Sequence, residues 1–250
     1  MQAKNLDGRT AVVTGARRGI GRAIALRLGA AGARLALVDH ESAEEAAAEA
    51  RAAGADAQAY LCDVRDVAAV ERLASEVGAR FATVNIVVNA AGIPMRRRIS
   101  DISLAEWQQT IDVNLTGPFL VSRAFLPRMR GQGYGRIVNM TSVMAHIATG
   151  DRPAYCAAKA GLLALTKSLA LDLAGERITV NAISPGAIAT DMTAALRADD
   201  KANAHLMAIT PLQRWGEPQE IAALANFLCS EEAGYITGTD VVIDGGWLAQ

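Results

Sequence analysis

The chain has 250 residues, 51% of them hydrophobic, and a formal net charge of −1. A chain of this size can bury a hydrophobic core without disulfides or metal ions to hold it together. Its near-neutral charge gives no basic surface for nucleic acid. No apolar run approaches the ~20 residues of a membrane span, and the N-terminus lacks the apolar segment of a secretory signal. We expect a single cytoplasmic domain over residues 1–250, with neither nucleic acid nor membrane as a partner.

The first half of the chain alternates short apolar segments with helical ones. The pattern predicts strands over residues 9–14, 33–38, 56–61 and 84–88, and helices over residues 19–31, 41–53 and 66–79. Near-continuous apolar strands separated by helices indicate a parallel sheet covered on both faces. Because such crossovers are right-handed, the fold class is α/β: a doubly wound, Rossmann-like sheet in a three-layer α/β/α domain.

The second half continues this alternation. It predicts helices over residues 104–129 and Pro153–Leu173, and strands over Gly135–Met140, 178–183 and 241–243. Residues 188–216 form a polar, mixed stretch that suits a cover over a substrate. The Pro153–Leu173 helix is apolar almost all round, which favours partial coverage by a second subunit.

A glycine-rich loop joins the first strand to the first helix. Residues 14–21 read Thr-Gly-Ala-Arg-Arg-Gly-Ile-Gly. Glycine allows a tight turn and a close approach of pyrophosphate, while the helix N-terminus attracts the anion. The spacing GxxxGxG differs from the common GxGxxG, but its place between strand and helix favours a dinucleotide site over a plain turn.

The second strand ends at Asp39, where a carboxylate can accept hydrogen bonds from the adenosine ribose. That carboxylate would repel the extra phosphate of NADP, whereas Arg17 and Arg18 could bind it or could be exposed loop charges. Because Asp39 stands where the ribose must lie, we expect NAD as the cofactor, with NADP the less favoured alternative.

Tyr155 and Lys159 lie one turn apart near the start of a helix, on the same face. Lowering a tyrosine pKa from about 10 to about 7 takes roughly 4 kcal/mol. An ammonium about 4 Å away supplies on the order of 4 kcal/mol at an effective dielectric of about 20. The same spacing also arises from packing with a lysine that reaches solvent. Ser142 follows the strand Gly135–Met140, so its hydroxyl either reaches the reacting oxygen or closes a turn.

These residues, taken with several others, resemble the short-chain dehydrogenase/reductase family over essentially the whole chain. The matching positions, in the family's order, are residues 14–21, Asp63, Val64, residues 89–92, Asn114, Ser142, Tyr155, Lys159, Pro185 and Gly186. The resemblance implies Tyr155 as general acid/base and Ser142 as the residue that orients the substrate oxygen. Lys159 would hold the nicotinamide ribose and lower the tyrosine pKa, and Asn114 would bind a proton-relaying water.

The resemblance also implies a set of cofactor contacts. Besides Tyr155, Lys159 and Asp39, they are Gly15, Arg18, Gly19, Ile20, Gly21, Asp63, Val64, Asn89, Ala90, Gly92, Pro185, Gly186, Ile188 and Thr190. The family's Asn-Asn-Ala-Gly is Asn-Ala-Ala-Gly here, so Ala90 lacks an amide and the local sheet hydrogen bonds are in doubt. No metal is expected, because neither the three histidines nor the scattered Cys62, Cys156 and Cys229 have metal-ligand spacing.

Basic residues near the crevice bear on the substrate. Arg96, Arg97, Arg98 and Arg214 suit a carboxylate or are solvated loop charges, and His146 and His205 could meet hydroxyls. Residues 196–199, 214–216 and 244–249 resemble family members acting on sugar acids, such as 2-deoxygluconate and gluconate dehydrogenases. The small-molecule substrate is thus expected to be a sugar acid or polyol.

Two alternatives stay open: a 3-oxoacyl thioester reductase using NADPH, and a nicotinamide-sensing protein without turnover. The second would carry a broken Ser–Tyr–Lys set, whereas Ser142, Tyr155 and Lys159 are all present. The resemblance further implies a homo-oligomer, a dimer or a tetramer, built through the helices around residues 114–129 and Pro153–Leu173. Of the two, the tetramer is favoured.

Overall fold

The computed structural model describes residues 5–249, in which seven strands form one parallel sheet with the order β3-β2-β1-β4-β5-β6-β7. This is the expected doubly wound, Rossmann-like sheet within a single domain. The strands are β1 (Thr10–Thr14), β2 (Arg34–Asp39), β3 (Ala57–Leu61), β4 (Ile86–Asn89), β5 (Gly135–Met140), β6 (Ile178–Pro185) and β7 (Asp240–Ile243).

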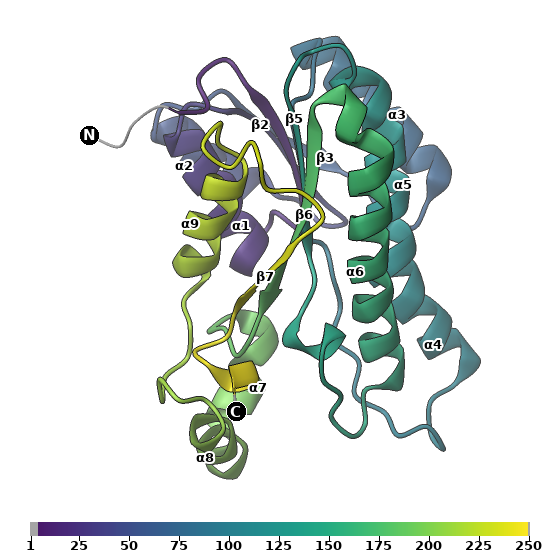
Figure 1. Ribbon diagram of the computed structural model, residues 1–250, viewed down its shortest axis with the longest axis vertical. Coiled ribbons are helices and arrows are strands. Elements are labelled where there is room, and N and C mark those ends of the chain that lie inside the picture. Colours follow the sequence, from purple (N-terminus) through teal and green to yellow (C-terminus); the bar gives the residue numbers. More distant parts are fainter. Residues whose placement is uncertain (1–4, 250) are drawn as a thin grey trace.

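Helices cover both faces of the sheet (Figure 1). On one face lie α1 (Gly19–Ala30), α2 (Glu44–Ala52) and α9 (Pro218–Leu228). On the other lie α3 (Val67–Phe81), α4 (Leu104–Ile111), α5 (Gly117–Met129) and α6 (Pro153–Leu173). Within residues 5–249 no helix has both the length and the apolar character that a membrane span requires.

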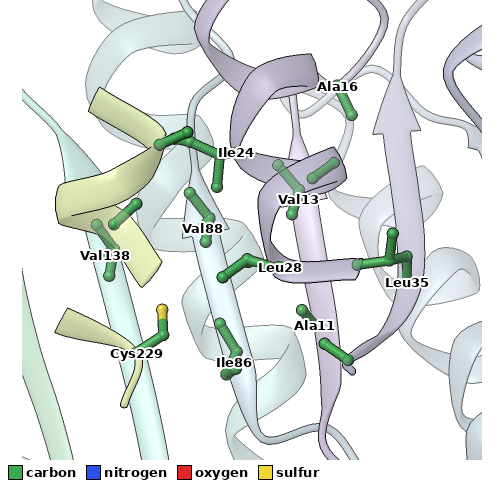
Figure 2. Packing of buried hydrophobic residues seen from close by; sticks show 14 of the residues in the cluster. Ala11, Val13, Ala16, Ile24, Leu28, Leu35, Ile86, Val88, Val138 and Cys229 are labelled. Carbon is green, nitrogen blue, oxygen red and sulfur yellow. The ribbon is translucent and has the colours of Figure 1, made fainter. Parts of the chain in front are cut away.

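The central strands are buried on both sides, which explains their unbroken apolar runs. Along β1, Ala11 and Val13 pack into the core beneath α1 and α9, and Val12 between them packs into the opposite core. Ile24 and Leu28, one turn apart on α1, meet the first of these cores (Figure 2). A strand that alternates between two apolar layers needs no polar face, so its sequence shows no period of two.

The strand order reverses between β1 and β4, and the ends of these two strands are tied together. The Thr14 hydroxyl oxygen accepts hydrogen bonds from the backbone N–H groups of Ala90 (3.1 Å) and Ala91 (3.2 Å). The strand end is therefore fixed through backbone groups, and the missing amide at Ala90 leaves these links intact. In doubly wound sheets ligands bind at such a reversal, beyond the carboxyl ends of the strands.

Two elements differ from the sequence-based expectation. The helix predicted over residues 104–129 is interrupted by a π-helical turn at Asp112–Thr116, and Pro118 lies in the first turn of α5. A π turn adds a residue to the helical repeat, and here it directs Asn114 into the interior. Helix α9 was not predicted, although it begins with Pro218 and buries Ile221, Ala225 and Leu228 at helical spacing.

The segment predicted as a cover is largely helical. It contains a 3₁₀ turn at Asp191–Thr193, α7 (Ala194–Ala198) and α8 (Asp200–Ala208). The Asp199 carboxylate caps α8 by accepting from the backbone N–H groups of Lys201 and Ala202, both at 3.0 Å. A bridge between Ile188 and Gly216 closes the base of the segment. The segment therefore leaves the body of the protein and returns to it at adjacent positions.

Candidate active site

A continuous crevice runs across the carboxyl ends of the strands at the point where the strand order reverses. It consists of two connected cavities of about 450 Å³ and about 750 Å³. Ala90, Gly92 and Thr190 line both of them. The smaller cavity lies over the glycine loop and the ends of β2 and β3, and the larger over the ends of β5 and β6.

Two glycines of the loop pack so closely against backbone that no side chain would fit at either position. Gly15 has φ +66°, and a Cβ there would lie 2.8 Å from the Ala90 carbonyl oxygen. A Cβ at Gly21 would lie 2.1 Å from the Gly15 carbonyl oxygen. No side chain caps the N-terminus of α1, and its first turn contains no acidic residue. An uncapped helix N-terminus behind this tight glycine cradle fits the pyrophosphate of a dinucleotide.

Asp39 lies at the far end of the smaller cavity. Its carboxylate accepts hydrogen bonds from the backbone N–H groups of Arg17 and Glu41, each at 3.2 Å. The three arginines that line this cavity all have acidic partners: Arg17–Glu41 at 3.3 Å, Arg18–Asp191 at 3.6 Å and Arg65–Asp63 at 2.6 Å. The Arg65 hydrogen bond also holds the pKa of Asp63 below its usual value.

All of the predicted site residues except one line the crevice. The smaller cavity is lined by Gly15, Arg18, Gly19, Gly21, Asp39, Asp63 and Val64; both cavities by Ile20, Ala90, Gly92 and Thr190; and the larger by Asn114, Ser142, Tyr155, Lys159, Pro185, Gly186 and Ile188.

The exception is Asn89, which lies behind the crevice wall. Its Nδ2 donates to the Ser122 hydroxyl (3.0 Å) and to Asn139 Oδ1 (2.8 Å). Asn139 in turn donates to the Thr166 hydroxyl at 2.9 Å. This chain of buried hydrogen bonds links β4 and β5 to α5 and α6. Asn89 therefore supports the strand end on which the crevice is built.

Three side chains meet in the larger cavity. Tyr155 and Lys159 come from the first two turns of α6, and Ser142 follows β5. The Tyr155 hydroxyl shares a hydrogen bond with Ser142. The Lys159 ammonium donates to the carbonyl of Met140, the last residue of β5, at 2.7 Å. Its Nζ lies 5.6 Å from the centroid of the Tyr155 ring.

Burial dominates the acidity of both titratable groups. It raises the pKa of the Tyr155 phenol, against the opposing effects of the Ser142 hydrogen bond and the Arg152 charge. It lowers the pKa of Lys159 from 10.5 to about 8. The expectation that Lys159 lowers the phenol pKa is therefore not met by the protein groups alone. The reason is that Lys159 Nζ is turned to the Met140 carbonyl, while burial is the largest effect on the pKa of the Tyr155 phenol.

Asn114 lies in the π-helical turn, beside the lysine. Its Nδ2 donates to the carbonyls of Ile93 (3.1 Å) and Thr110 (3.0 Å), and its Oδ1 is buried without a hydrogen-bond partner in the structure. A Cβ added at Gly92 would lie 2.9 Å from this oxygen and 3.7 Å from Lys159 Nζ. A buried acceptor left open beside an ammonium is a place where a water can bind.

Several residues proposed for substrate contact lie elsewhere. Arg98 and Arg214 do not line the crevice: Arg98 lies 3.4 Å from Asp151, and Arg214 pairs with both Glu220 oxygens. His146 and His205 also lie outside the crevice lining, and His146 Nε2 is 2.5 Å from Asp240. Cys156, next to Tyr155, likewise does not line it.

Among the residues of the larger cavity that sequence reasoning missed is the cation Arg152. It precedes Tyr155 by three positions, directly before the proline that begins α6. Helical spacing places residues three apart on one face, so a charge at this position could have been noticed. Arg96 and Arg97, which were noted in the sequence, also line the larger cavity.

Comparisons with known proteins agree with this geometry. A family model described as Enoyl-(Acyl carrier protein) reductase matches residues 15–248. A D-threitol dehydrogenase of Mycolicibacterium smegmatis is 42% identical over 245 residues, covering 97% of this chain and 94% of that protein. A 3-oxoacyl-[acyl-carrier-protein] reductase of Escherichia coli is 40% identical over 242 residues, covering 97% and 98%.

Solved structures extend the similarity to the whole fold. A protein from Agrobacterium tumefaciens assigned as a gluconate dehydrogenase has a TM-score of 0.96 and 37% identity, with 100% of both chains covered. A second protein from that organism, assigned as a 2-deoxy-D-gluconate 3-dehydrogenase and solved with bound NADP, has a TM-score of 0.93 and 38% identity, again with 100% of both chains covered.

Proposed function

The chain belongs to the short-chain dehydrogenase/reductase family, and from that premise we propose that it oxidises the secondary alcohol of a sugar acid or polyol with NAD. Membership of the family makes the chain an oxidoreductase with a nicotinamide cofactor. The observation that carries the finer proposal is the larger cavity, in which Tyr155, Ser142 and Lys159 meet beside the glycine cradle. The set is complete, which argues against a sensor without turnover.

In this mechanism the protein moves the proton and holds the reacting oxygen. In the direction of oxidation Tyr155, as the phenolate, takes the hydroxyl proton of the substrate, while the Ser142 hydroxyl donates a hydrogen bond to the same oxygen. When bound, the nicotinamide ring supplies the hydride chemistry at the carbon. Lys159 places a positive charge that favours the phenolate, and Asn114 Oδ1 holds a water beside the ammonium. In reduction Tyr155 returns the proton to the oxygen.

Asp39 supports NAD as the cofactor. The phosphate that distinguishes NADP carries about −1.5 to −2 charges at neutral pH, so a carboxylate at the ribose end opposes it. Each of the arginines that line the smaller cavity already pairs with an acid, so none of the three is a free guanidinium for that phosphate. The neighbouring structure solved with NADP makes the test necessary.

Asp39→Asn should shift the cofactor preference toward NADP. The amide keeps one acceptor oxygen for the backbone N–H groups but removes the charge, so kcat/KM with NADP should rise about 10-fold, which corresponds to about 1.4 kcal/mol. The value with NAD should fall by a smaller factor. Initial rates with each cofactor, at a saturating level of one substrate, give the ratio. An unchanged ratio would mean that Asp39 has no part in cofactor choice.

The substrate class rests on the cavity and on the relatives together. Guanidinium groups of Arg96 and Arg152 line the larger cavity, and they suit an oxygen-rich or acidic substrate better than an acyl chain. The relatives include a D-threitol dehydrogenase and proteins assigned to gluconate and 2-deoxygluconate. A 3-oxoacyl thioester reductase using NADPH is the second candidate, favoured by the 40% identity to the Escherichia coli reductase.

Two further features belong to this proposal. Residues 188–216 serve as the substrate cover, because Thr190, Leu196 and Leu206 of this segment line the larger cavity. The chain assembles as a homotetramer through α5 and α6, because Leu171 is 82% exposed and Phe119 is 40% exposed on helices of the outer layer. Light scattering after gel filtration would then give the mass of four chains.

A substrate panel tests the function. Sugar acids, the matching polyols and 3-oxoacyl thioesters are each supplied with NAD(H) and NADP(H), and turnover is read from nicotinamide absorbance. The proposal predicts the highest kcat/KM for a sugar acid or polyol with NAD. A higher value for a thioester with NADPH would replace it with the second candidate. No turnover with any pair would point to a binding protein.

A further inference from the structure

Arg152 is a guanidinium without a partner in the wall of the larger cavity. The side chain is half-buried, and its Nε is buried without a hydrogen-bond partner in the described part of the chain. A guanidinium stays charged at every physiological pH, so its burial without an anion is costly. Burial and the nearby charge of Arg96 both lower the pKa of Arg152, and both arginines line the larger cavity.

Two neighbouring arginines, in contrast, each pair with a carboxylate. Arg97 Nε lies 3.3 Å from Glu106, and Arg98 Nε lies 3.4 Å from Asp151. Within residues 5–249 neither Arg152 nor Arg96 forms such a pair. Both line the cavity, so the unpaired positive charge is directed toward the space that a substrate enters.

The acids that line the same cavity are committed to other bonds. Glu106 accepts from the backbone N–H and the hydroxyl of Ser103, closing the capping box of α4. Asp199 caps α8. Neither carboxylate is paired with Arg152, so the cavity keeps an uncompensated positive charge at this wall. An anion brought by the substrate would supply the missing partner.

We propose that Arg152, aided by Arg96, holds the carboxylate of the substrate and thereby selects a hydroxy acid over a neutral polyol. A planar guanidinium binds a carboxylate through two parallel hydrogen bonds, which fixes orientation as well as charge. Arg152 stands one helical turn before Tyr155, so the carboxylate and the reacting alcohol belong to one small molecule. This inference rests on the proposed function and narrows its substrate class.

The inference is tested by comparing an acid with its neutral counterpart. Gluconate and the matching polyol glucitol are supplied to the NAD-loaded wild type, to Arg152→Gln and to the control Arg98→Gln. Arg98 belongs, with Arg96, to the run of three arginines at residues 96–98, but it lies outside the crevice and pairs with Asp151. We expect Arg152→Gln to lower kcat/KM for gluconate about 10- to 100-fold, mainly through KM, because hydrogen bonds to charged groups are of this strength.

The neutral polyol supplies the internal control. Turnover of glucitol should change no more than about threefold in Arg152→Gln, because glucitol has no carboxylate for Arg152 to bind. Arg98→Gln should leave kcat/KM unchanged for both substrates. An equal loss for both substrates would overturn the inference, since Arg152 would then act only through the acidity of Tyr155. Wild type that oxidises polyols but not acids would overturn it too, while leaving the proposed function in place.

Binding gives a readout that does not depend on turnover. Calorimetric titration of gluconate into each NAD-loaded protein should give at least tenfold weaker binding for Arg152→Gln than for wild type, and an intermediate value for Arg152→Lys. Equal binding by wild type and Arg152→Gln would overturn the inference, and so would absence of binding by wild type. Preference for a phosphate ester of the polyol over gluconate would exclude the carboxylate.

Discussion

Tyr155→Phe should lower kcat about 10³-fold while NADH still binds. General acid–base catalysis contributes about 10²- to 10⁴-fold, and the Tyr155 phenol is the acid–base group beside the Ser142 hydroxyl in the larger cavity. The ring of phenylalanine keeps the packing, so folding loses only one hydrogen bond, worth about 1 kcal/mol. Initial-rate assays give kcat, and fluorescence titration gives the affinity for NADH.

The matched control is Tyr235→Phe, because Tyr235 is fully exposed and lies outside the crevice lining. It should keep wild-type kcat. Substantial turnover by Tyr155→Phe would mean that another group exchanges the proton. Loss of NADH binding together with kcat would instead show that the substitution had disturbed the cofactor site.

Lys159→Met should lower kcat/KM about 10²-fold or more, and it should do so without unfolding the protein. A methionine nearly matches the length of the lysine but removes the charge that favours the phenolate. The drop of the lysine pKa from 10.5 to about 8 corresponds to about 3 kcal/mol of preference for the neutral form in the folded state. Replacing this buried cation should therefore leave the free energy of unfolding at or above the wild-type value, despite the lost bond to Met140.

The pH dependence of stability checks this account of Lys159. Between pH 8 and 10.5 the unfolded lysine is protonated and the folded one is not, so unfolding takes up a proton and stability rises with pH. That rise should be present in wild type and in Lys167→Met, an exposed position of the same helix, and absent in Lys159→Met. Denaturant titrations across this range give the slopes. Identical slopes in all three proteins would contradict the lowered pKa of the buried Lys159.

The central strands could be predicted from the sequence because their physics is local. Val12, Val13, Val87 and Val88 lie in apolar runs that suit a strand with cores on both sides. The glycine loop could also be predicted, because Gly15 and Gly21 are positions where a Cβ would collide with backbone. In both cases the prediction depended on residues that are neighbours in the sequence: apolar side chains in the strands, and the lack of a side chain in the loop.

Other features depend on contacts between distant segments. The π-helical turn that places Asn114 has no local signature, because it is set by packing of α4 and of the turn itself against α6. Whether an arginine is free or paired also depends on the whole fold: Arg214 pairs with Glu220, while Arg152 forms no salt bridge with any acid of residues 5–249. The sequence could therefore locate the run Arg96–Arg98, but it could identify neither which of these line the larger cavity nor the contribution of Arg152.

The acidity of the phenol was the hardest property to predict. The spacing of Tyr155 and Lys159 suggested that the ammonium would lower the tyrosine pKa, but burial of both groups acts in the opposite sense. Burial depends on every element around the larger cavity and cannot be obtained from a spacing of four. For Tyr155 to act as the base, nearby cations and hydrogen-bond donors must lower the phenol pKa more than burial raises it once the cofactor is bound.

The most direct test of the account is an ultraviolet titration of the Tyr155 phenol with and without NAD⁺. The difference between wild type and Tyr155→Phe isolates this phenol from the other tyrosines, two of which, Tyr60 and Tyr134, have pKa values raised by burial. With NAD⁺ bound, the account predicts a phenol that titrates below its ordinary pKa of about 10, and in the free protein one that titrates above it. A phenol that still titrates above 10 with NAD⁺ bound would contradict the role of Tyr155 as the base.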